Sequence, residues 1–158
     1  MYLNTIANYI IIDLLAQNGN NSKIENILII LEYNKKKIKY KMRIESRYIQ
    51  SLNREIPYLV GTNAQDNFDI IDESDDSDLW FHLSGHSSCH VIAKIPQDIT
   101  LDKKQKLQII KQGALICKQN SKYKSEINLQ IIYTSIANVV KGNVIGQVDA
   151  SNVKHIAV

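Results

Sequence analysis

Two short segments of alternating side chains, joined by a turn of serine, glycine and histidine, constrain the fold of this chain most strongly. Residues 78–83 and 88–95 each alternate apolar residues with mainly polar ones, which predicts two β-strands around the turn 84–87. An antiparallel hairpin centred on His86 opposes apolar residues on one face, in the pairs Leu83/Cys89, Phe81/Val91 and Leu79/Ala93. On its other face it opposes His82/His90, Trp80/Ile92 and Asp78/Lys94. A slip by one residue would place the apolar set against the polar set, so the pattern predicts this register up to steps of two.

The segments on either side predict further strands and one long helix. Residues 38–49 alternate, with an apolar face formed by Ile38, Tyr40, Met42 and Ile44, and a return strand is predicted at 56–60 after a turn near 52–54. A helix is predicted from Leu101 to about Asn120 after the N-cap Thr100, with a buried stripe of Leu107, Ile110, Ala114 and Cys117. Residues 127–133, 146–150 and 153–158 predict three more strands. This order indicates an α+β fold, a mainly antiparallel sheet with one long helix packed on it.

Residues 1–36 are predicted to form a helical appendage to a domain of residues 37–158. Apolar residues are too dense for clean alternation in segments 3–16 and 23–33, and Ser22 with Glu25 forms a capping box for the second segment. A chain of 158 residues has room for one ordinary domain with such an appendage. We therefore expect two parts and a single large core.

Cysteine usage and the N-terminal sequence indicate a cytoplasmic protein. Neither Cys89 nor Cys117 has a Cys or His partner at zinc-like spacing, and two cysteines do not suggest a disulfide framework. The first residues lack the basic region of a signal peptide, and the apolar run 6–16 is too short to span a bilayer. We expect no membrane partner.

Charge is distributed unevenly, although the formal net charge is only +3. Residues 35–54 hold eight basic residues against one acidic residue, and residues 103–158 hold nine against two. Residues 55–102 hold one basic residue against ten acidic residues. The two basic blocks either converge on one cationic surface, which suits nucleic acid, or form separate solvated faces.

Three side chains on the polar face of the predicted hairpin are candidate functional groups: Trp80, His82 and His90. Trp80 either is exposed for stacking on a base or packs within the core. The two histidines either donate to phosphate, act as acid/base groups or metal ligands, or are satisfied residues of the sheet. No nearby carboxylate or thiol set completes a metal site, and the adjacent residues Cys89 and His90 point to opposite faces of a strand. We therefore assign no catalytic residue, metal or cofactor, and do not expect an enzyme.

With these residues placed, the sequence resembles the NFACT-R domain, the RNA-binding module of the NFACT family, in its stand-alone form. The resemblance covers about residues 43–158. The motifs that carry it are Arg47-Tyr48, Val60–Asn67, Asp78–His82, Ser88–Val91, Ser121-Lys122, Tyr133-Thr134, Lys141-Gly142 and Gly146–Val148. Asp-Leu-Trp-Phe-His and the following Ser-x-His-Val are the most specific of them.

The resemblance implies an RNA ligand, with tRNA and rRNA as the candidates, in translation or ribosome quality control, and the ribosome as a candidate partner. The residues expected to contact nucleic acid are Arg47, Gly61, Asn63, Asn67, Trp80, His82, His90, Lys94, Ser121, Lys122, Lys141 and Gly142. Glycines allow close approach of the backbone to phosphates, and the basic residues supply charge.

Three alternatives stay open at this point. The ligand can be DNA, because the sequence does not reveal whether a 2′-hydroxyl is read. The chain can be a nucleic-acid-processing enzyme that uses His82 and His90. It can also be a protein-interaction subunit of a translation-related complex, with the predicted N-terminal helices as its docking surface.

Overall fold

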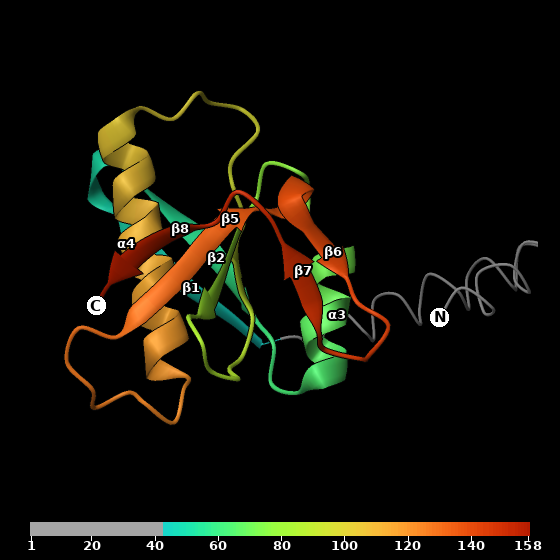
Figure 1. Ribbon diagram of the computed structural model, residues 1–158. Helices are drawn as coiled ribbons and strands as arrows, with labels where there is room; N and C mark the ends of the chain where they lie inside the picture. The colour runs from blue at the N-terminus through green and yellow to red at the C-terminus, as the bar shows by residue number, and fades with distance from the viewer. Residues whose placement is uncertain (1–42) are drawn as a thin grey trace, which may run out of the picture. The chain divides into compact units, whose positions relative to one another are not determined.

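The computed structural model describes residues 43–158 (Figure 1). The predicted appendage of residues 1–36 and the first part of the strand predicted at 38–49 lie outside the described residues. No helix of the described part is long and apolar enough to cross a membrane.

A six-stranded antiparallel sheet forms the centre of the described domain, in the strand order β1-β2-β4-β3-β5-β8. Its strands are β1 (Arg43–Ile49), β2 (Arg54–Val60), β3 (Leu79–Leu83), β4 (Val91–Ala93), β5 (Gln130–Ser135) and β8 (Lys154–Ala157). The other elements are β6 (Val139–Lys141), β7 (Val148–Ala150), the helices α3 (Ala64–Asp72) and α4 (Lys103–Gln119), and short 3₁₀ turns at Gln50–Leu52 and Ile136–Asn138. The α+β class and the mainly antiparallel sheet are confirmed.

The hairpin register predicted from the sequence is confirmed. Residues of β3 and β4 pair as Leu79 with Ala93, Trp80 with Ile92 and Phe81 with Val91. The predicted turn near 52–54 is also present, where Asn53 adopts a left-handed conformation between β1 and β2. The pairing of β3 with both β4 and β5 places the hairpin inside the sheet.

Helix α4 covers one face of the sheet, as predicted, and buries the larger core. Phe81 packs directly under Gly113, where an added Cβ would lie 2.4 Å from the phenyl Cζ. Of the predicted stripe, Ile110, Ala114 and Cys117 are buried. Leu107 is 46% exposed, because at 100° per residue it falls on the flank of a buried stripe centred between Ile109 and Gly113.

The start of α4 differs from the prediction by two residues. Asp102, not Thr100, is the N-cap, and its side chain accepts a hydrogen bond from the Gln105 main-chain N–H at 2.8 Å. The Gln105 side chain accepts in return from the Asp102 N–H at 2.9 Å. This reciprocal capping box satisfies two donors at the helix start, which a threonine two residues earlier cannot do.

Helix α3 and the β6–β7 hairpin cover part of the other face of the sheet (Figure 1). A second, smaller core lies there, formed by Leu59, Ile70, Trp80, Ile92 and Ile136. Helix α3 has no counterpart among the predicted elements. Its sequence signal is the N-cap Asn63, whose side chain accepts from the Asp66 N–H at 2.9 Å.

The predicted buried face of the first strand is wrong within the described residues. Ile44 is 51% exposed. The opposite face of β1, with Glu45 and Arg47, contacts the end of α4 through Asn120 and Gln119. Edge strand β1 therefore directs Glu45 and Arg47 toward the end of α4, where they form hydrogen bonds with the side-chain amides of Asn120 and Gln119.

The close packing of α4 on β3 makes Gly113 a stability determinant. We expect Gly113→Ala to destabilise the domain by about 1–3 kcal/mol in urea denaturation, because the added methyl overpacks against Phe81 and this outweighs the gain in helix propensity. The exposed control Lys111→Ala should change stability by less than about 0.5 kcal/mol. An unchanged or higher stability of Gly113→Ala would contradict this packing.

Candidate nucleic-acid interface

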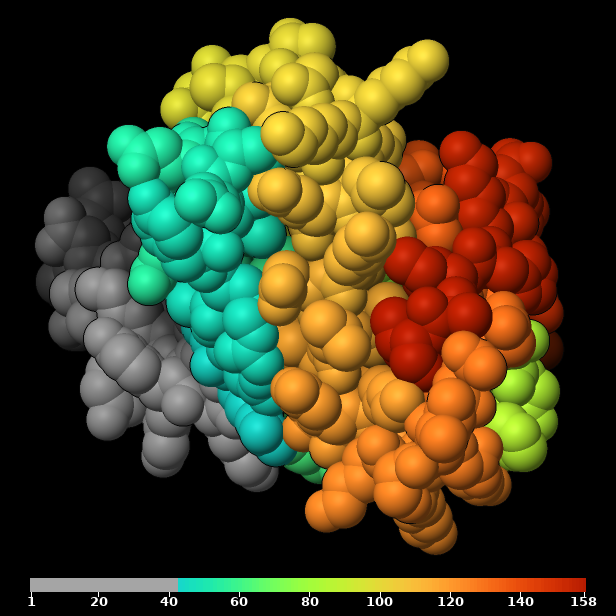
Figure 2. All heavy atoms as spheres, turned by 90° about the vertical axis from the view of Figure 1, so that its left-hand side faces the viewer, coloured from blue at the N-terminus to red at the C-terminus, as the bar shows by residue number. Residues whose placement is uncertain are grey.

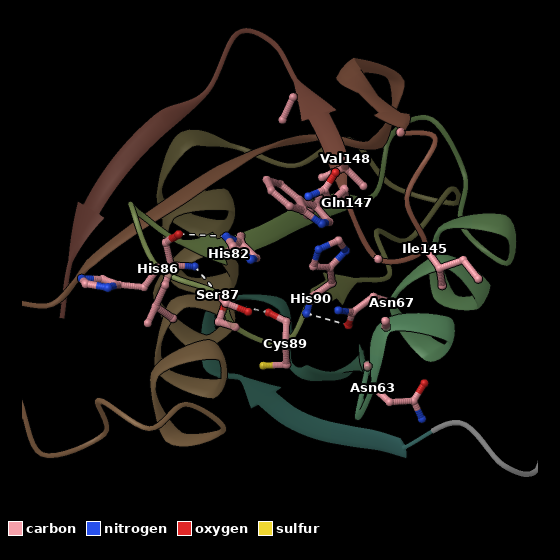
Figure 3. Close-up of a pocket in the computed structure, with 18 of the residues that line it drawn as sticks. Asn63, Asn67, His82, His86, Ser87, Cys89, His90, Ile145, Gln147 and Val148 are labelled. Atoms are coloured by element: carbon pink, nitrogen blue, oxygen red, sulfur yellow. Dashed lines mark hydrogen bonds between the residues drawn. The ribbon is translucent and has the colours of Figure 1, made fainter.

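A groove of about 1410 Å³ lies where three connections of the fold meet (Figure 3). Its walls come from the β2–α3 connection, the β3–β4 hairpin and the loop between β6 and β7. Gly146 adopts a positive φ of 86° in that loop, and an added Cβ would lie 2.8 Å from the Cβ of Ala64. The glycine therefore lets the β6–β7 loop approach the start of α3 closely enough to form the groove wall.

The groove brings together seven of the twelve residues that the sequence singled out. These are Gly61, Asn63, Asn67, Trp80, His82, His90 and Gly142. The remaining five, Arg47, Lys94, Ser121, Lys122 and Lys141, do not line it. The structure thus divides the predicted site into a groove and residues outside it.

Trp80, His82 and His90 form an aromatic cluster in the groove wall. The Trp80 and His82 rings stack, with centroids 5.6 Å apart and planes 3° apart. His90 meets both rings edge-on, with centroids 5.2 Å from each. Figure 3 shows His82 and His90 as neighbours in the wall, as the predicted cross-strand pairing requires.

Trp80 is not an exposed stacking platform. The side chain is only 1% exposed, so the alternative in which it packs within the core is confirmed. The reason is the second layer of α3 and β6–β7, which covers the sheet face that carries Trp80.

Both groove histidines are neutral at pH 7. Burial lowers the pKa of His90 to about 3, and the neighbouring His82 adds to this effect. Burial also lowers the pKa of His82, although hydrogen bonds to the main chain of Leu83 and Ser88 oppose it. Since the Leu83 carbonyl only accepts, His82 Nδ1 donates to it at 2.8 Å. Each ring therefore brings one donor and one acceptor, and no positive charge for a phosphate.

Asn67 and Gly61 position His90. The Asn67 side-chain oxygen accepts a hydrogen bond from the His90 main-chain N–H at 3.0 Å, and the Gly61 N–H donates to the His90 carbonyl at 3.0 Å. A Cβ on Gly61 would lie 2.0 Å from that Asn67 oxygen. The glycine is therefore required by the close approach of the asparagine.

Three of the predicted phosphate-binding cations are paired within the protein. Arg47 contacts Glu45 at 2.8 Å, Lys94 contacts Asp75 at 3.0 Å and also Asp78, and Lys141 contacts Asp72. Their acidic partners come from the acidic block or lie two residues away in the same strand. The charge that the sequence assigned to RNA is here largely neutralised by carboxylates.

Lysines without a carboxylate side-chain partner gather instead on α4 and the loop that follows it. Residues 103–125 contain seven lysines and no acidic residue. Among the described residues, none of these lysines has a carboxylate side chain within ion-pair distance. Figure 2 shows α4 running along an open face between β1–β2 and the C-terminal strand.

We call five of these lysines the lysine face: Lys104, Lys111, Lys118, Lys122 and Lys124. The first three are spaced by seven residues, close to two helical turns, and so lie in one row along α4. Lys104 and Lys111 are exposed, whereas Lys118 is half-buried and donates to the Val158 main-chain oxygen at 2.9 Å. Lys122 and Lys124 are exposed in the loop after the helix. The basic block at 103–158 was the sequence signal for this face. The helix shows in addition that three of its lysines follow one line along α4.

The end of α4 adjoins the groove. Asn120 lines the groove, and three residues later the Tyr123 ring contacts the exposed ring of His86 in the β3–β4 turn, with centroids 4.5 Å apart. Ser121 shapes this corner, since its hydroxyl donates to the Lys118 carbonyl and accepts from the Tyr123 N–H. The lysine face and the groove are therefore adjacent surfaces.

Within residues 43–158, no group of three or more His, Cys, Asp or Glu side chains is arranged to hold a metal ion. Cys89 and Cys117 are both free thiols.

Comparison with known proteins identifies residues 45–150 as matching the NFACT protein RNA binding domain. Coiled-coil domain-containing protein 25 of Danio rerio is 30% identical over 89 residues, which cover 52% of this chain and 40% of that protein. The C-terminal part of the fibronectin/fibrinogen-binding protein of Streptococcus suis has a similar fold, with a TM-score of 0.59 and 21% identity, over 75% of this chain and 46% of that one. The chain thus spans less than half the length of each relative.

The neutral state of His90 predicts a pH-dependent stability. The unfolded chain binds a proton at the ordinary histidine pKa of about 6.5, whereas native His90 remains neutral to about pH 3. The contribution of neutral His90 to the free energy of unfolding is therefore fully present above pH 6.5 and is lost as the pH falls from there toward 3. Lowering the pH from 7 to 5 should cost about 2 kcal/mol of unfolding free energy through this residue.

His90→Phe, which keeps a ring and removes the titration, should reduce that loss by a similar amount in urea denaturation. His155→Phe, at an exposed position, is the matched control and should behave as wild type. Equal pH dependence in wild type and His90→Phe would show that His90 is not held neutral.

Proposed function

The chain belongs to the NFACT RNA-binding domain family, and from this premise we propose that it binds RNA. In this proposal the sugar-phosphate backbone of the RNA lies on the lysine face. The observation that carries the proposal is the concentration of seven lysines in residues 103–124, none of which has a carboxylate side-chain partner among the described residues, without one acidic residue among them. Phosphate contacts dominate the affinity of proteins for nucleic acid, and cations already held by carboxylates contribute little to them.

The geometry of α4 suits a phosphate backbone. Lys104 and Lys111 present mobile ammonium groups to solvent, whereas the ammonium of the half-buried Lys118 donates to the Val158 main-chain oxygen at 2.9 Å. The exposed loop lysines extend the row toward the groove. Leu107 and Leu115 are partly exposed between the lysines of the row and give the face apolar contact area. Such contacts set orientation without reading sequence.

For the ligand, the proposal names tRNA or rRNA, in translation or ribosome quality control. The support is the likeness of the motifs to the NFACT family, in whose full-length members this domain works at the large ribosomal subunit. The two free thiols fit a reducing compartment, and we place the protein in the cytoplasm. The ribosome is then a natural partner.

Neutralising the lysine face should weaken RNA binding. We expect Lys104→Gln/Lys111→Gln to reduce affinity for single-stranded RNA by about tenfold at low salt, measured by fluorescence anisotropy. The slope of log affinity against log salt should become shallower by about 0.7 for each phosphate that the variant no longer neutralises.

The charge-matched control is Arg54→Gln/Lys141→Gln, which removes two cations that are ion-paired to Asp98 and Asp72. It should leave affinity within about twofold of wild type, because these charges are already compensated. If the two double variants weaken binding equally, net charge and not the lysine face controls binding.

The identity of the RNA can be tested in cells. Crosslinking followed by sequencing of the bound RNA should recover tRNA or rRNA fragments with the wild type. Recovery should fall several-fold with Lys104→Gln/Lys111→Gln, and Arg54→Gln/Lys141→Gln serves as the matched control. Enrichment of messenger RNA alone would contradict the translation-machinery assignment while leaving RNA binding intact.

A further inference from the structure

We propose that the groove receives an unpaired base of the bound RNA, read as a neutral heterocycle, while the lysine face holds the backbone. This inference rests on the proposed RNA-binding function and adds a second surface with a different chemistry. It assigns the aromatic cluster of Trp80, His82 and His90 to base recognition.

The lining of the groove is almost without charge. Among the described residues, its only ionic side chains are Arg43, which is paired to Glu45 at 3.0 Å, and Asp149. Amides and hydroxyls dominate the rest of its polar lining: Thr62, Asn63, Asn67, Ser87, Ser88, Asn120, Asn143 and Gln147. Amide side chains match the donor and acceptor edges of bases, whereas the part of the lining that the structure describes offers a phosphate no cation without an acidic partner.

Two buried nitrogen atoms in this groove have no hydrogen-bond partner. They are Trp80 Nε1 and His90 Nδ1, and no other buried side-chain nitrogen or oxygen of residues 43–158 is left unpaired. Both side chains are more than nine-tenths buried, and both residues line the groove. Since native proteins pair nearly all buried polar atoms, two orphans at one place indicate a polar ligand.

The groove also has the size and position for part of a polymer. Its volume of about 1410 Å³ exceeds the roughly 300–1,000 Å³ of pockets for small ligands. The contact between His86 and Tyr123 lies where the end of the lysine face reaches the groove. When the RNA backbone lies on α4, a flexible nucleotide of that RNA can therefore reach past this corner and place its base in the groove.

The test uses Trp80, which is the single tryptophan of the whole chain and reports directly on the groove. We expect adenosine, guanosine, cytidine or uridine to change its emission saturably, with excitation at a wavelength where the nucleosides do not absorb. Ribose 5-phosphate should cause no change. If ribose 5-phosphate causes a saturable response equal to that of the nucleosides, the groove does not recognise a base and the proposal is overturned. The proposal is also overturned if none of the nucleosides changes the emission.

Two variants locate the response. His82→Ala removes the ring that stacks on Trp80 and should weaken nucleoside binding by about tenfold, whereas His155→Ala, at an exposed position, should not. Lys104→Gln/Lys111→Gln should keep the nucleoside response while its affinity for RNA falls by about tenfold. An unchanged nucleoside affinity in His82→Ala places the base elsewhere and overturns the proposal.

A second measurement needs no variant. A single-stranded RNA hexamer should bind wild type several-fold more tightly than the same hexamer with abasic ribose at every position, since both carry the same phosphates. Equal affinity of the two hexamers, with a normal salt dependence, would overturn base recognition and leave backbone binding intact. Loss of RNA binding altogether, with a retained nucleoside response, would instead overturn the proposed function.

Discussion

The register between β3 and β4 is the constraint on which the rest of the structure depends. It turns Phe81 and Val91 toward α4, and Trp80 and Ile92 toward α3 and the β6–β7 hairpin. The fully buried Asp78 holds the open end of this hairpin, because its carboxylate accepts from the Ile95 N–H at 2.7 Å and from the Asp75 N–H at 2.9 Å, and pairs with Lys94. A shift by one residue would bury the polar set under α4 and leave this carboxylate without partners.

The two candidate surfaces owe their different chemistry to the two faces of the sheet. The lysines of α4 have no carboxylate side-chain partner among the described residues, and no acidic residue lies in residues 103–125. On the other face, a second layer buries His90 and half-buries His82, and this burial lowers the pKa of both histidines. The fold thus separates a charged surface, which suits a backbone, from a neutral groove, which suits bases.

Much of this could be predicted from local pattern. Alternation in two strands of the hairpin was sufficient to bring His82 beside His90, and helical spacing was sufficient for most of the buried stripe of α4. Helix α3 was missed because it is only nine residues long and its N-cap Asn63 stands directly after Gly61 and Thr62, in a segment typical of a turn. The pairing of Lys141 with Asp72 could not be predicted either, since these residues are 69 positions apart and only the packing of β6 near α3 joins them.

By itself, the sequence determined the hairpin register, the α+β class, the family motifs and the basic character of residues 103–124, because each depends on neighbours along the chain. Only the tertiary structure decided which cations form ion pairs with carboxylates and that Trp80 is buried. It also decided that the two histidines are uncharged. The physical reason is that burial and ion pairing are set by segments far apart in sequence, whose approach no local periodicity encodes.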